Sequence, residues 1–288
     1  MSNEASLDAR APPPSVSIVG AGVVGKALAA RLLRAGVQVL GPHGRQLPAS
    51  VSAADIVLIA VRDDLIPEVA TRLVNEALLR PGQILLHTSG AHAAAAVLAA
   101  ARPHVRAVGT WHPLLSFADA RAAAEGSQEI AFGIEGDEPA RAAAQALVRA
   151  LGARAVLLDG ASLPLYHAGA ALASNYVVAL ADLARRLLVT AGVPAEQALP
   201  ALIPLLSSVV QNLETVGLPG ALTGPVQRGD VSTVEQHLRA LAARSPETLE
   251  LYRLVGRHVL RLAREKSELS AETVDRLEDL FGAPRPKN

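Results

Sequence analysis

The residues VSIVGAGVVGKALAARLLRAG, from Val16 to Gly36, carry the strongest structural signal in the chain. A short strand-like run leads into Gly20, Gly22 and Gly25, and an alanine- and leucine-rich run typical of a helix follows. In a dinucleotide-binding loop, the first glycine permits a sharp turn and the second lets the backbone approach a pyrophosphate. The third lets the helix pack closely on the strand. The spacing alone is a weak signal that a turn binding nothing can share, but its place between a strand and a helix favours binding.

A dinucleotide bound here would place its phosphates at the start of that helix, where unpaired N–H groups and the positive end of the helix dipole attract anions. Open α/β sheets bind ligands beyond the carboxyl ends of their strands, so loops after later strands should contribute as well. The residues predicted to contact the cofactor are Gly20, Ala21, Gly22, Val23, Val24, Gly25, Arg45, Val61, Arg62, Ser89 and Gly90.

We expect the cofactor to be NADP(H). About twenty residues beyond the first glycine, an NAD site carries Asp or Glu to bind the ribose hydroxyls. Here the chain reads GPHGRQ over residues 41–46, with no carboxylate. A carboxylate would repel a 2′-phosphate, whereas an arginine fork can bind one. Arg45 is therefore the predicted phosphate ligand, and the alternative is a solvated loop arginine.

The composition excludes several functional classes. The 288 residues include 27 Lys and Arg against 27 Asp and Glu, without a basic block, so nucleic acid is not an expected partner. There is no cysteine for a disulfide, a thiolate nucleophile or a thiolate metal site, and no histidine spacing that suits zinc. No signal peptide or uninterrupted apolar run of membrane-spanning length is apparent. We expect a soluble cytoplasmic protein with no membrane contact.

Strand-like and helical runs alternate up to about residue 159, which predicts a mostly parallel α/β sheet, and the rest of the chain has helical character throughout. The predicted strands cover residues 16–19, 37–40, 55–61, 83–88, 106–110, 129–136 and 153–159. The predicted organisation is a disordered leader (1–14), an NADP-binding Rossmann domain (15–160), a helical substrate and dimerisation domain (161–281) and a tail (282–288).

Polar residues follow several predicted strands and are therefore candidates for the reactive end of the site. Ser89 can offer a hydroxyl and Gly90 a bare backbone, while His112 can transfer a proton. Each has an ordinary alternative, because Ser-Gly forms turns and His-Pro forms a rigid bend. Asp63 and Asp64 more readily start a helix than carry chemistry.

The first long helical segment after the sheet carries His167, Ala171 and Asn175 at intervals of four, so we expect them on one helix face. A histidine and an asparagine on such an apolar helix need partners, which a ligand can supply. The alternative is a structural histidine and a capping or interhelical asparagine.

A turn-rich stretch further along the chain contains a second group of polar residues. Asp230 is placed to cap a helix over residues 231–244. Thr223 and Arg228 can reach an anionic substrate from this loop. Arg228 can equally pair with Asp230 and only fix the turn.

Seven blocks of sequence follow one another along the chain: IVGAGVVG (18–25), AVRDDLI (60–66), HTSGA (87–91), GTWHPLLSF (109–117), FGIEGDE (132–138), YHAGAALASNY (166–176) and ALTGPVQRGD (221–230). Together they resemble a bacterial family of Rossmann-like proteins with a helical C-terminal domain of uncertain function, provisionally labelled NADP oxidoreductases. Some members look like an alternative ketopantoate reductase. The fold is similar to that of pyrroline-5-carboxylate reductase, 6-phosphogluconate dehydrogenases and ketopantoate reductases. The resemblance implies a C-terminal domain of the 6-phosphogluconate dehydrogenase type and, by analogy, a homodimer.

In the hydroxyacid branch of this superfamily, the first helix of the second domain carries a catalytic lysine with an asparagine one turn later. Asn175 matches the asparagine, but the lysine position falls on Ala171. Lysine chemistry therefore cannot be carried over. His167, one turn earlier, becomes the expected proton donor on that face.

These residues lead to one hypothesis and two alternatives. The hypothesis is NADP(H)-dependent reduction of a small ketone or imine, such as the 2-oxo acid ketopantoate, in a cleft between the two domains. His167 would donate the proton and Asn175 would polarise the carbonyl, with His112 or Ser89 assisting. The alternatives are an NADP(H)-binding redox sensor without turnover, which the missing lysine keeps open, and a deazaflavin-dependent NADP reductase.

Overall fold

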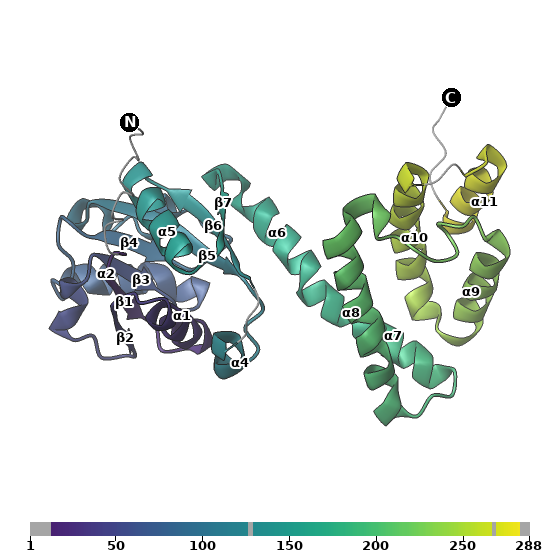
Figure 1. Ribbon diagram of the computed structural model, residues 1–288, viewed down its shortest axis with the longest axis horizontal. Coiled ribbons are helices and arrows are strands. Elements are labelled where there is room, and N and C mark those ends of the chain that lie inside the picture. Colours follow the sequence, from purple (N-terminus) through teal and green to yellow (C-terminus); the bar gives the residue numbers. More distant parts are fainter. Residues whose placement is uncertain (1–12, 126–128, 267–268, 283–288) are drawn as a thin grey trace, which may run out of the picture. The chain divides into compact units, whose positions relative to one another are not determined.

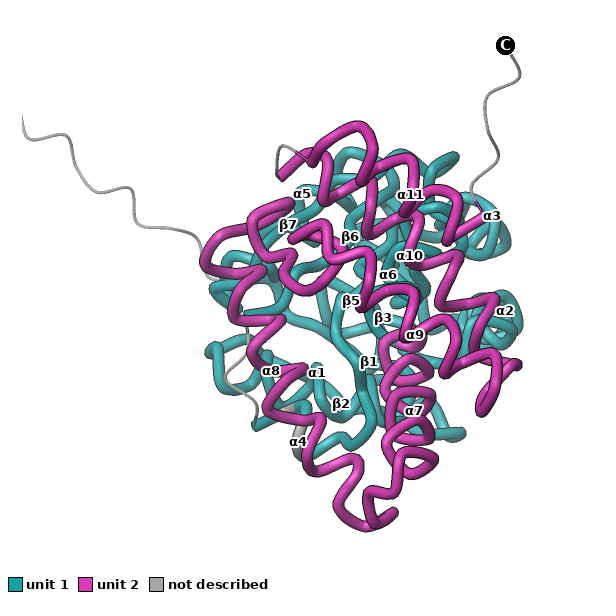
Figure 2. The backbone as a smooth tube through the Cα atoms, turned by 90° about the vertical axis from the view of Figure 1, so that its right-hand side faces the viewer, with its two compact units in different colours: residues 1–174 teal, residues 175–288 magenta. Residues whose placement is uncertain are grey.

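The structure is a computed structural model that describes residues 13–125, 129–266 and 269–282. The chain divides into two compact units, a sheet unit that ends at Ser174 and a helical unit that begins at Asn175 (Figure 2). Of the predicted leader (1–14) and tail (282–288), all but residues 13, 14 and 282 lie outside the described residues.

The sheet unit alternates strands and helices (Figure 1). Within the described residues its sheet has seven strands in the order β2-β1-β3-β4-β5-β6-β7, all parallel to their neighbours except β5 and β6. The mostly parallel α/β sheet predicted from the sequence is confirmed. The elements are β1 (Val16–Val19), α1 (Val23–Arg34), β2 (Val39–His43), β3 (Ile56–Ile59), α2 (Ile66–Asn75), β4 (Ile84–His87), α3 (Ala94–Val97), β5 (Ala107–Leu114), α4 (Ala120–Glu125), β6 (Ala131–Gly136), α5 (Glu138–Ala150), β7 (Arg154–Leu157) and α6 (Leu163–Ala173).

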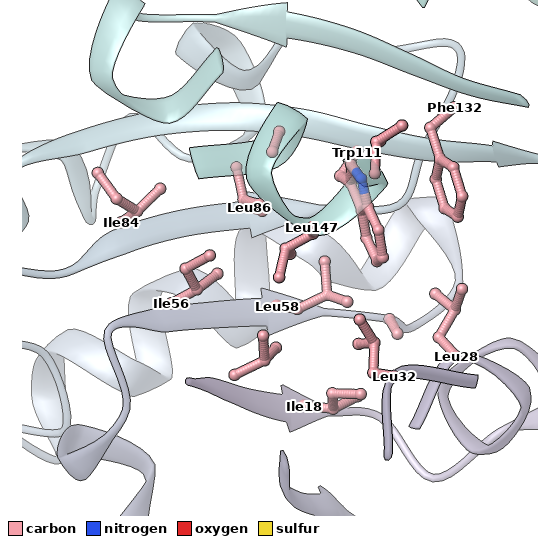
Figure 3. Close-up of a cluster of buried hydrophobic side chains, with 14 of the residues drawn as sticks. Ile18, Leu28, Leu32, Ile56, Leu58, Ile84, Leu86, Trp111, Phe132 and Leu147 are labelled. Carbon is pink, nitrogen blue, oxygen red and sulfur yellow. The ribbon is translucent and has the colours of Figure 1, made fainter. Parts of the chain in front are cut away.

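Alternate residues of the central strands enter two hydrophobic cores, because successive side chains of a strand point to opposite faces. Ile56 and Leu58 of β3 pack on the face covered by α1 and α5 (Figure 3). Val57 and Ile59 of the same strand pack on the face covered by α2 and α3. Burial on both faces explains why β3 is apolar throughout.

Strand β1 lies between β2 and β3, so the chain moves to opposite sides of β1 when it forms these two neighbours. Such a reversal opens a crevice beyond the carboxyl ends of the strands. The glycine loop follows β1 directly, and the order of the strands therefore places it at this crevice.

Strand β5 is longer than the sequence predicts. Its pairing with the antiparallel β6 continues through His112 and Gly133 to Leu114. His112 therefore lies in a strand, where the sequence suggested a loop. Trp111 is fully buried and stacks on Phe132, with 4.3 Å between the ring centroids, which secures this extension.

The helical unit has its core among α9, α10 and α11, and Asp230 caps α9 by accepting hydrogen bonds from the backbone N–H of Thr233 (3.1 Å) and from its hydroxyl (2.6 Å). The predicted cap is confirmed. Helix α8 contains three prolines and is interrupted at Gly217 and Leu218. The elements are α7 (Asn175–Thr190), α8 (Ala195–Gly220), α9 (Val231–Arg244), α10 (Pro246–Lys266) and α11 (Ala271–Phe281).

The segment predicted as one long helix forms two, because Ser174 leaves the helical conformation with φ −126° and ψ −79°. The predicted stripe of three residues is wrong as a feature of one helix: His167 and Ala171 lie on α6, whereas Asn175 begins α7 in the other unit. We place the domain boundary at residue 160 from the sequence, whereas the compact sheet unit includes α6. Tyr166 of α6 packs against Gly133 of β6, which joins that helix to the sheet.

Candidate functional site

A cavity of about 940 Å³ lies in the sheet unit at the carboxyl ends of β1, β2 and β3. It extends from Arg45, after β2, to His112 on β5. Its volume falls in the range of small-molecule and cofactor sites, roughly 300–1,000 Å³. The cavity is lined by these residues of the predicted cofactor set: Gly20, Ala21, Gly22, Val23, Val24, Arg45, Val61 and Arg62.

The glycine loop is shaped by two close backbone contacts and one open position. A Cβ at Gly20 would lie 2.2 Å from the carbonyl oxygen of Ala60, and one at Gly25 would lie 1.9 Å from that of Gly20. At Gly22 nothing lies within 4 Å of that position. Gly22 is the N-cap of α1, and no side chain in this fully described helix caps its first turn or places a carboxylate there. The first N–H groups of α1 are therefore free to bind an anion.

The end of the cavity near β2 carries two arginines, of which the sequence identified one. Arg72 of α2 lines the cavity beside Arg45 and donates from Nη1 to the carbonyl oxygen of Arg45 at 2.6 Å. Its Nε also donates to Glu76 at 2.6 Å. Arg72 thus holds the loop that carries Arg45. Its helical position gives no sign of this role, because the contact joins residues far apart in the chain.

Ser89 lies in a polar cluster behind the cavity wall and is almost fully buried. Its Oγ donates to Asp63 Oδ2 at 2.7 Å and lies 3.0 Å from Nδ1 of His92. The same His92 nitrogen is 3.6 Å from Asp63 Oδ2. Asp63 belongs to a short 3₁₀ turn before α2, but Leu65 is the N-cap of α2 and no side chain forms a capping hydrogen bond there. The contact of Asp63 with Ser89 is a role that the sequence did not reveal.

The imidazole of His112 forms the far wall of the cavity and is held from two sides. Its Nδ1 lies 2.9 Å from the hydroxyl of Tyr166. Its ring lies against Gly90, where a Cβ would come within 2.8–2.9 Å of three ring atoms. The ring of His167 stands nearly perpendicular to it, with 6.0 Å between the centroids. His112, Tyr166 and His167 therefore form one cluster within the sheet unit.

Burial makes His112 a neutral imidazole at neutral pH. Loss of solvent, and to a smaller extent the nearby His167, lower its pKa to about 4, against a still smaller opposite effect of Asp63. Burial also raises the pKa of the Tyr166 hydroxyl to about 12, so this group keeps its proton. His87, fully buried behind Ser89, has its pKa lowered to about 4 by loss of solvent.

These shifts predict that acid weakens the fold before the carboxylates titrate. The unfolded chain binds protons at the ordinary histidine pKa of 6.5, whereas His87 and His112 resist them down to about 4. Their stabilising contribution is therefore complete above pH 6.5 and declines as the pH falls towards 4. We expect the free energy of unfolding to fall by up to about 1.4 kcal/mol per pH unit for each histidine.

Urea unfolding of the protein between about pH 5 and 6.5 measures this slope. In a His112→Gln variant the free energy of unfolding should depend less steeply on pH, because, of the two histidines, only His87 then contributes. A free energy of unfolding that stays constant over this interval in the unsubstituted protein contradicts the predicted burial of both neutral rings.

The other predicted site residues lie in different places. Gly25 and Ser89 do not line the cavity, and Gly90 lies beneath the ring of His112. His167 is exposed on α6, and Asn175 belongs to the helical unit. Arg62 lines the cavity, but its guanidinium forms two hydrogen bonds with Asp64, at 3.0 and 2.7 Å.

Comparison with known proteins supports the fold and matches two parts of the chain to family models. The chain matches a Rossmann-like domain over residues 42–104 and the domain of unknown function DUF2520 over residues 130–259. No protein of curated function matches the sequence.

Several solved structures share the architecture. Protein TM1727 from Thermotoga maritima is 22% identical, with a TM-score of 0.68 over 87% of this chain and 99% of that one. BF3122 from Bacteroides fragilis, provisionally named an NADP oxidoreductase, is 22% identical, with a TM-score of 0.64 over 86% and 98%. The pyrroline carboxylate reductase of Plasmodium falciparum, solved with NADP bound, is 12% identical, with a TM-score of 0.58 over 93% and 98%.

At these identities the solved structures establish the fold, and the two models each match one part of the chain. The Rossmann-type sheet followed by an all-helical region agrees with the resemblance drawn from the seven sequence blocks. The chain therefore contains a region that matches a Rossmann-like domain and a region that matches DUF2520, and it shares the fold of the solved structures described above.

Proposed function

We propose that the protein is an oxidoreductase that uses NADP(H) to reduce a small ketone or imine. One observation carries the proposal: the glycine loop at the start of α1 and the neutral imidazole of His112 line the same cavity. The solved structures of similar fold include a pyrroline carboxylate reductase with NADP bound and an imine reductase, which supports a cofactor and a substrate of these classes.

The residues of the cavity fit a nicotinamide dinucleotide. The uncapped first turn of α1 offers N–H groups to phosphate oxygens, and the open position at Gly22 lets a pyrophosphate approach the backbone. Arg45 and Arg72 stand at the end of β2, where a 2′-phosphate on the adenosine ribose would need positive charge. His112 lies at the other end, which leaves the reactive ring and the substrate on its side.

When bound, the cofactor supplies a hydride to the carbon of a C=O or C=N group. The protein must then stabilise the charge that develops on the oxygen or nitrogen and deliver a proton. His112 suits the first task. In the tautomer that the proposal requires, the Tyr166 hydroxyl donates to Nδ1 and the imidazole carries its proton on Nε2, which has no hydrogen-bond partner in the described part of the chain. A neutral imidazole N–H can polarise a carbonyl without becoming charged.

His167 is the proposed proton donor. It lies next to His112 on α6 and is exposed, so water can return the proton after each turnover. Asn175 remains the proposed second polarising group by its match to the superfamily asparagine. Ser89 is proposed to order Asp63 and His92 around the reactive end through its hydroxyl.

Arg45 is predicted to set the preference for NADPH over NADH. An arginine–phosphate contact is worth roughly 1.5–3 kcal/mol, so Arg45→Ala should reduce the ratio of the two affinities by about tenfold to a hundredfold. Binding titrations of both reduced coenzymes measure the ratio. Arg121→Ala, which removes an exposed arginine paired with Glu125 on α4, is the matched control and should leave the ratio unchanged. Equal affinity of the unsubstituted protein for the two coenzymes contradicts the NADP assignment.

Turnover is tested by following NADPH absorbance with ketopantoate, other 2-oxo acids and cyclic imines. Oxidation of NADPH by a member of this panel supports the reductase. Tight NADPH binding without turnover of any member favours a redox sensor, for which Ala171 at the lysine position is the supporting observation. NADPH oxidation that requires an added deazaflavin identifies the third alternative.

We also propose that the helical unit forms a homodimer. Among the described helices, α8 alone is long and apolar enough to cross a membrane by length and composition, and none of its most apolar window is buried. It also carries Glu196, Gln211, Asn212 and Glu214, which suit a protein interface better than lipid. A solution mass of one chain at micromolar concentration contradicts the dimer. The exposed large apolar residues on α7 and α8 are Tyr176, Val177, Val178, Leu180, Val189, Leu199, Ile203, Leu205, Val209, Val210, Leu213, Val216 and Leu218.

A further inference from the structure

Three polar side chains stand next to one another across neighbouring strands of the sheet. His87 of β4 pairs with Thr110 of β5, and Thr110 pairs with Glu135 of β6. Their relative exposures are 0%, 0% and 8%. On β3 the corresponding position is the buried Ile59. Polar groups at such depth cost stability unless each finds a partner, so the contacts of this row matter.

The hydrogen bonds of the row have a fixed direction. The backbone N–H of Ser89 donates to Nδ1 of His87 at 3.1 Å, so this nitrogen carries no proton. The proton of the neutral ring is therefore on Nε2, which lies 3.2 Å from Thr110 Oγ1 and donates to it. The Thr110 hydroxyl in turn donates to Glu135 Oε2 at 2.9 Å. The backbone N–H of Ala94 donates to that same carboxylate oxygen at 3.0 Å.

The two ends of this row hold the two ends of one loop. Ser89 stands at the start of the segment 88–93 between β4 and α3, and Ala94 follows its last residue. The loop contains the hydroxyl of Ser89, which binds Asp63 and His92, and it contains Gly90, on which His112 rests. We infer that His87, Thr110 and Glu135 act as a buried clamp that fixes loop 88–93 and thereby positions Ser89 and the support of His112.

The clamp positions groups and does not transfer protons. At the His87 end of the row the donor is the backbone N–H of Ser89, which keeps its proton at neutral pH. A proton therefore cannot pass from Glu135 to the cavity along the row. Burial, which lowers the pKa of His87 to about 4, also keeps the ring neutral at the pH of the cell. The inference rests on the proposed function only where it concerns turnover, because the clamp itself is a property of the fold.

Thr110→Val tests the clamp, with Thr110→Ser as its matched control. Valine has the shape of threonine but breaks both central hydrogen bonds, whereas serine keeps the hydroxyl. We expect hydrogen exchange of the Ser89 and Ala94 amides to rise about tenfold in the valine variant and to stay unchanged in the serine variant. The amide of Ile18 in β1 should be unaffected in both. Unchanged exchange at Ser89 and Ala94 in the valine variant, or an equal rise across the sheet, overturns the inference.

A second measurement needs no substitution. Nitrogen-15 NMR of the imidazoles distinguishes the two neutral forms of histidine, and His87 should carry its proton on Nε2 at pH 7. A proton on Nδ1, or a charged ring, overturns the direction of the row. This measurement remains decisive even where the valine variant fails to fold.

Turnover provides a separate measurement. With a substrate found in the NADPH assay, Thr110→Val should lower kcat about tenfold or more. The NADPH affinity should be nearly unchanged, because the phosphate-binding residues lie at the other end of the cavity. A protein without any turnover refutes the proposed reductase while the exchange experiment still decides on the clamp. Increased exchange with an unchanged kcat refutes the positioning role.

Discussion

Gly22→Ser should keep its fold and lose most of its affinity for a dinucleotide. Gly22 has φ −75° and ψ −173°, a conformation open to any residue, and nothing lies within 4 Å of the position of a Cβ. Serine is also a better helix N-cap than glycine, so the melting temperature should stay the same or rise. The new side chain would occupy the space that a pyrophosphate needs. We expect the dissociation constant for NADPH to rise about a hundredfold, equivalent to roughly 3 kcal/mol.

Gly25→Ala is the contrasting variant. Its methyl group would lie 1.9 Å from the carbonyl oxygen of Gly20, so α1 would have to shift on β1 and the stability should fall. Thermal unfolding and NADPH titration of both variants separate the two roles of the loop. Full NADPH affinity in the serine variant would show that no pyrophosphate approaches this position.

His112→Ala should lower kcat by about 10²-fold, because removal of a single donor to a developing oxyanion typically costs that much. NADPH affinity should change little, since the phosphate-binding residues lie at the other end of the cavity. The low pKa of His112, about 4, also means that its ionisation should not affect the rate between about pH 6 and 8. Steady-state kinetics with the best substrate of the panel measure both effects.

Two further variants separate polarisation from general damage. Tyr166→Phe removes only the hydroxyl that orients the imidazole and should give a smaller loss of kcat than His112→Ala. His104→Ala removes an exposed histidine from a short 3₁₀ turn and should have no effect. A His112→Ala enzyme with normal kcat would exclude this ring from the chemistry.

The sequence predicted the sheet well because local signals specify it. Each of the seven runs that the sequence marks as strands overlaps a strand of the sheet, and the glycine spacing marks the first crossover. The extension of β5 through His112 was not predictable, because it depends on pairing with β6, which follows later in the chain and runs antiparallel. The break at Ser174 was missed for a similar reason, since α6 is tied to the sheet through Tyr166 and Gly133.

The candidate site was only partly predictable. The glycine loop and Arg45 follow strands directly, where position in the fold implies access to a ligand. Arg72 and Asp63 act through partners distant in the chain, and nothing in their own neighbourhoods indicates those contacts. The tautomer of His87 follows from a backbone N–H that only the folded loop supplies.

The contact between His112 and Gly90 affects how experiments at residue 90 should be interpreted. Even a methyl group there would collide with the imidazole, which belongs to a different strand. An inactive Gly90 mutant would thus report a displaced histidine rather than a lost ligand contact. A second-site change that made room for the ring could restore such a mutant, and the two positions should therefore be varied together in any attempt to redesign the pocket.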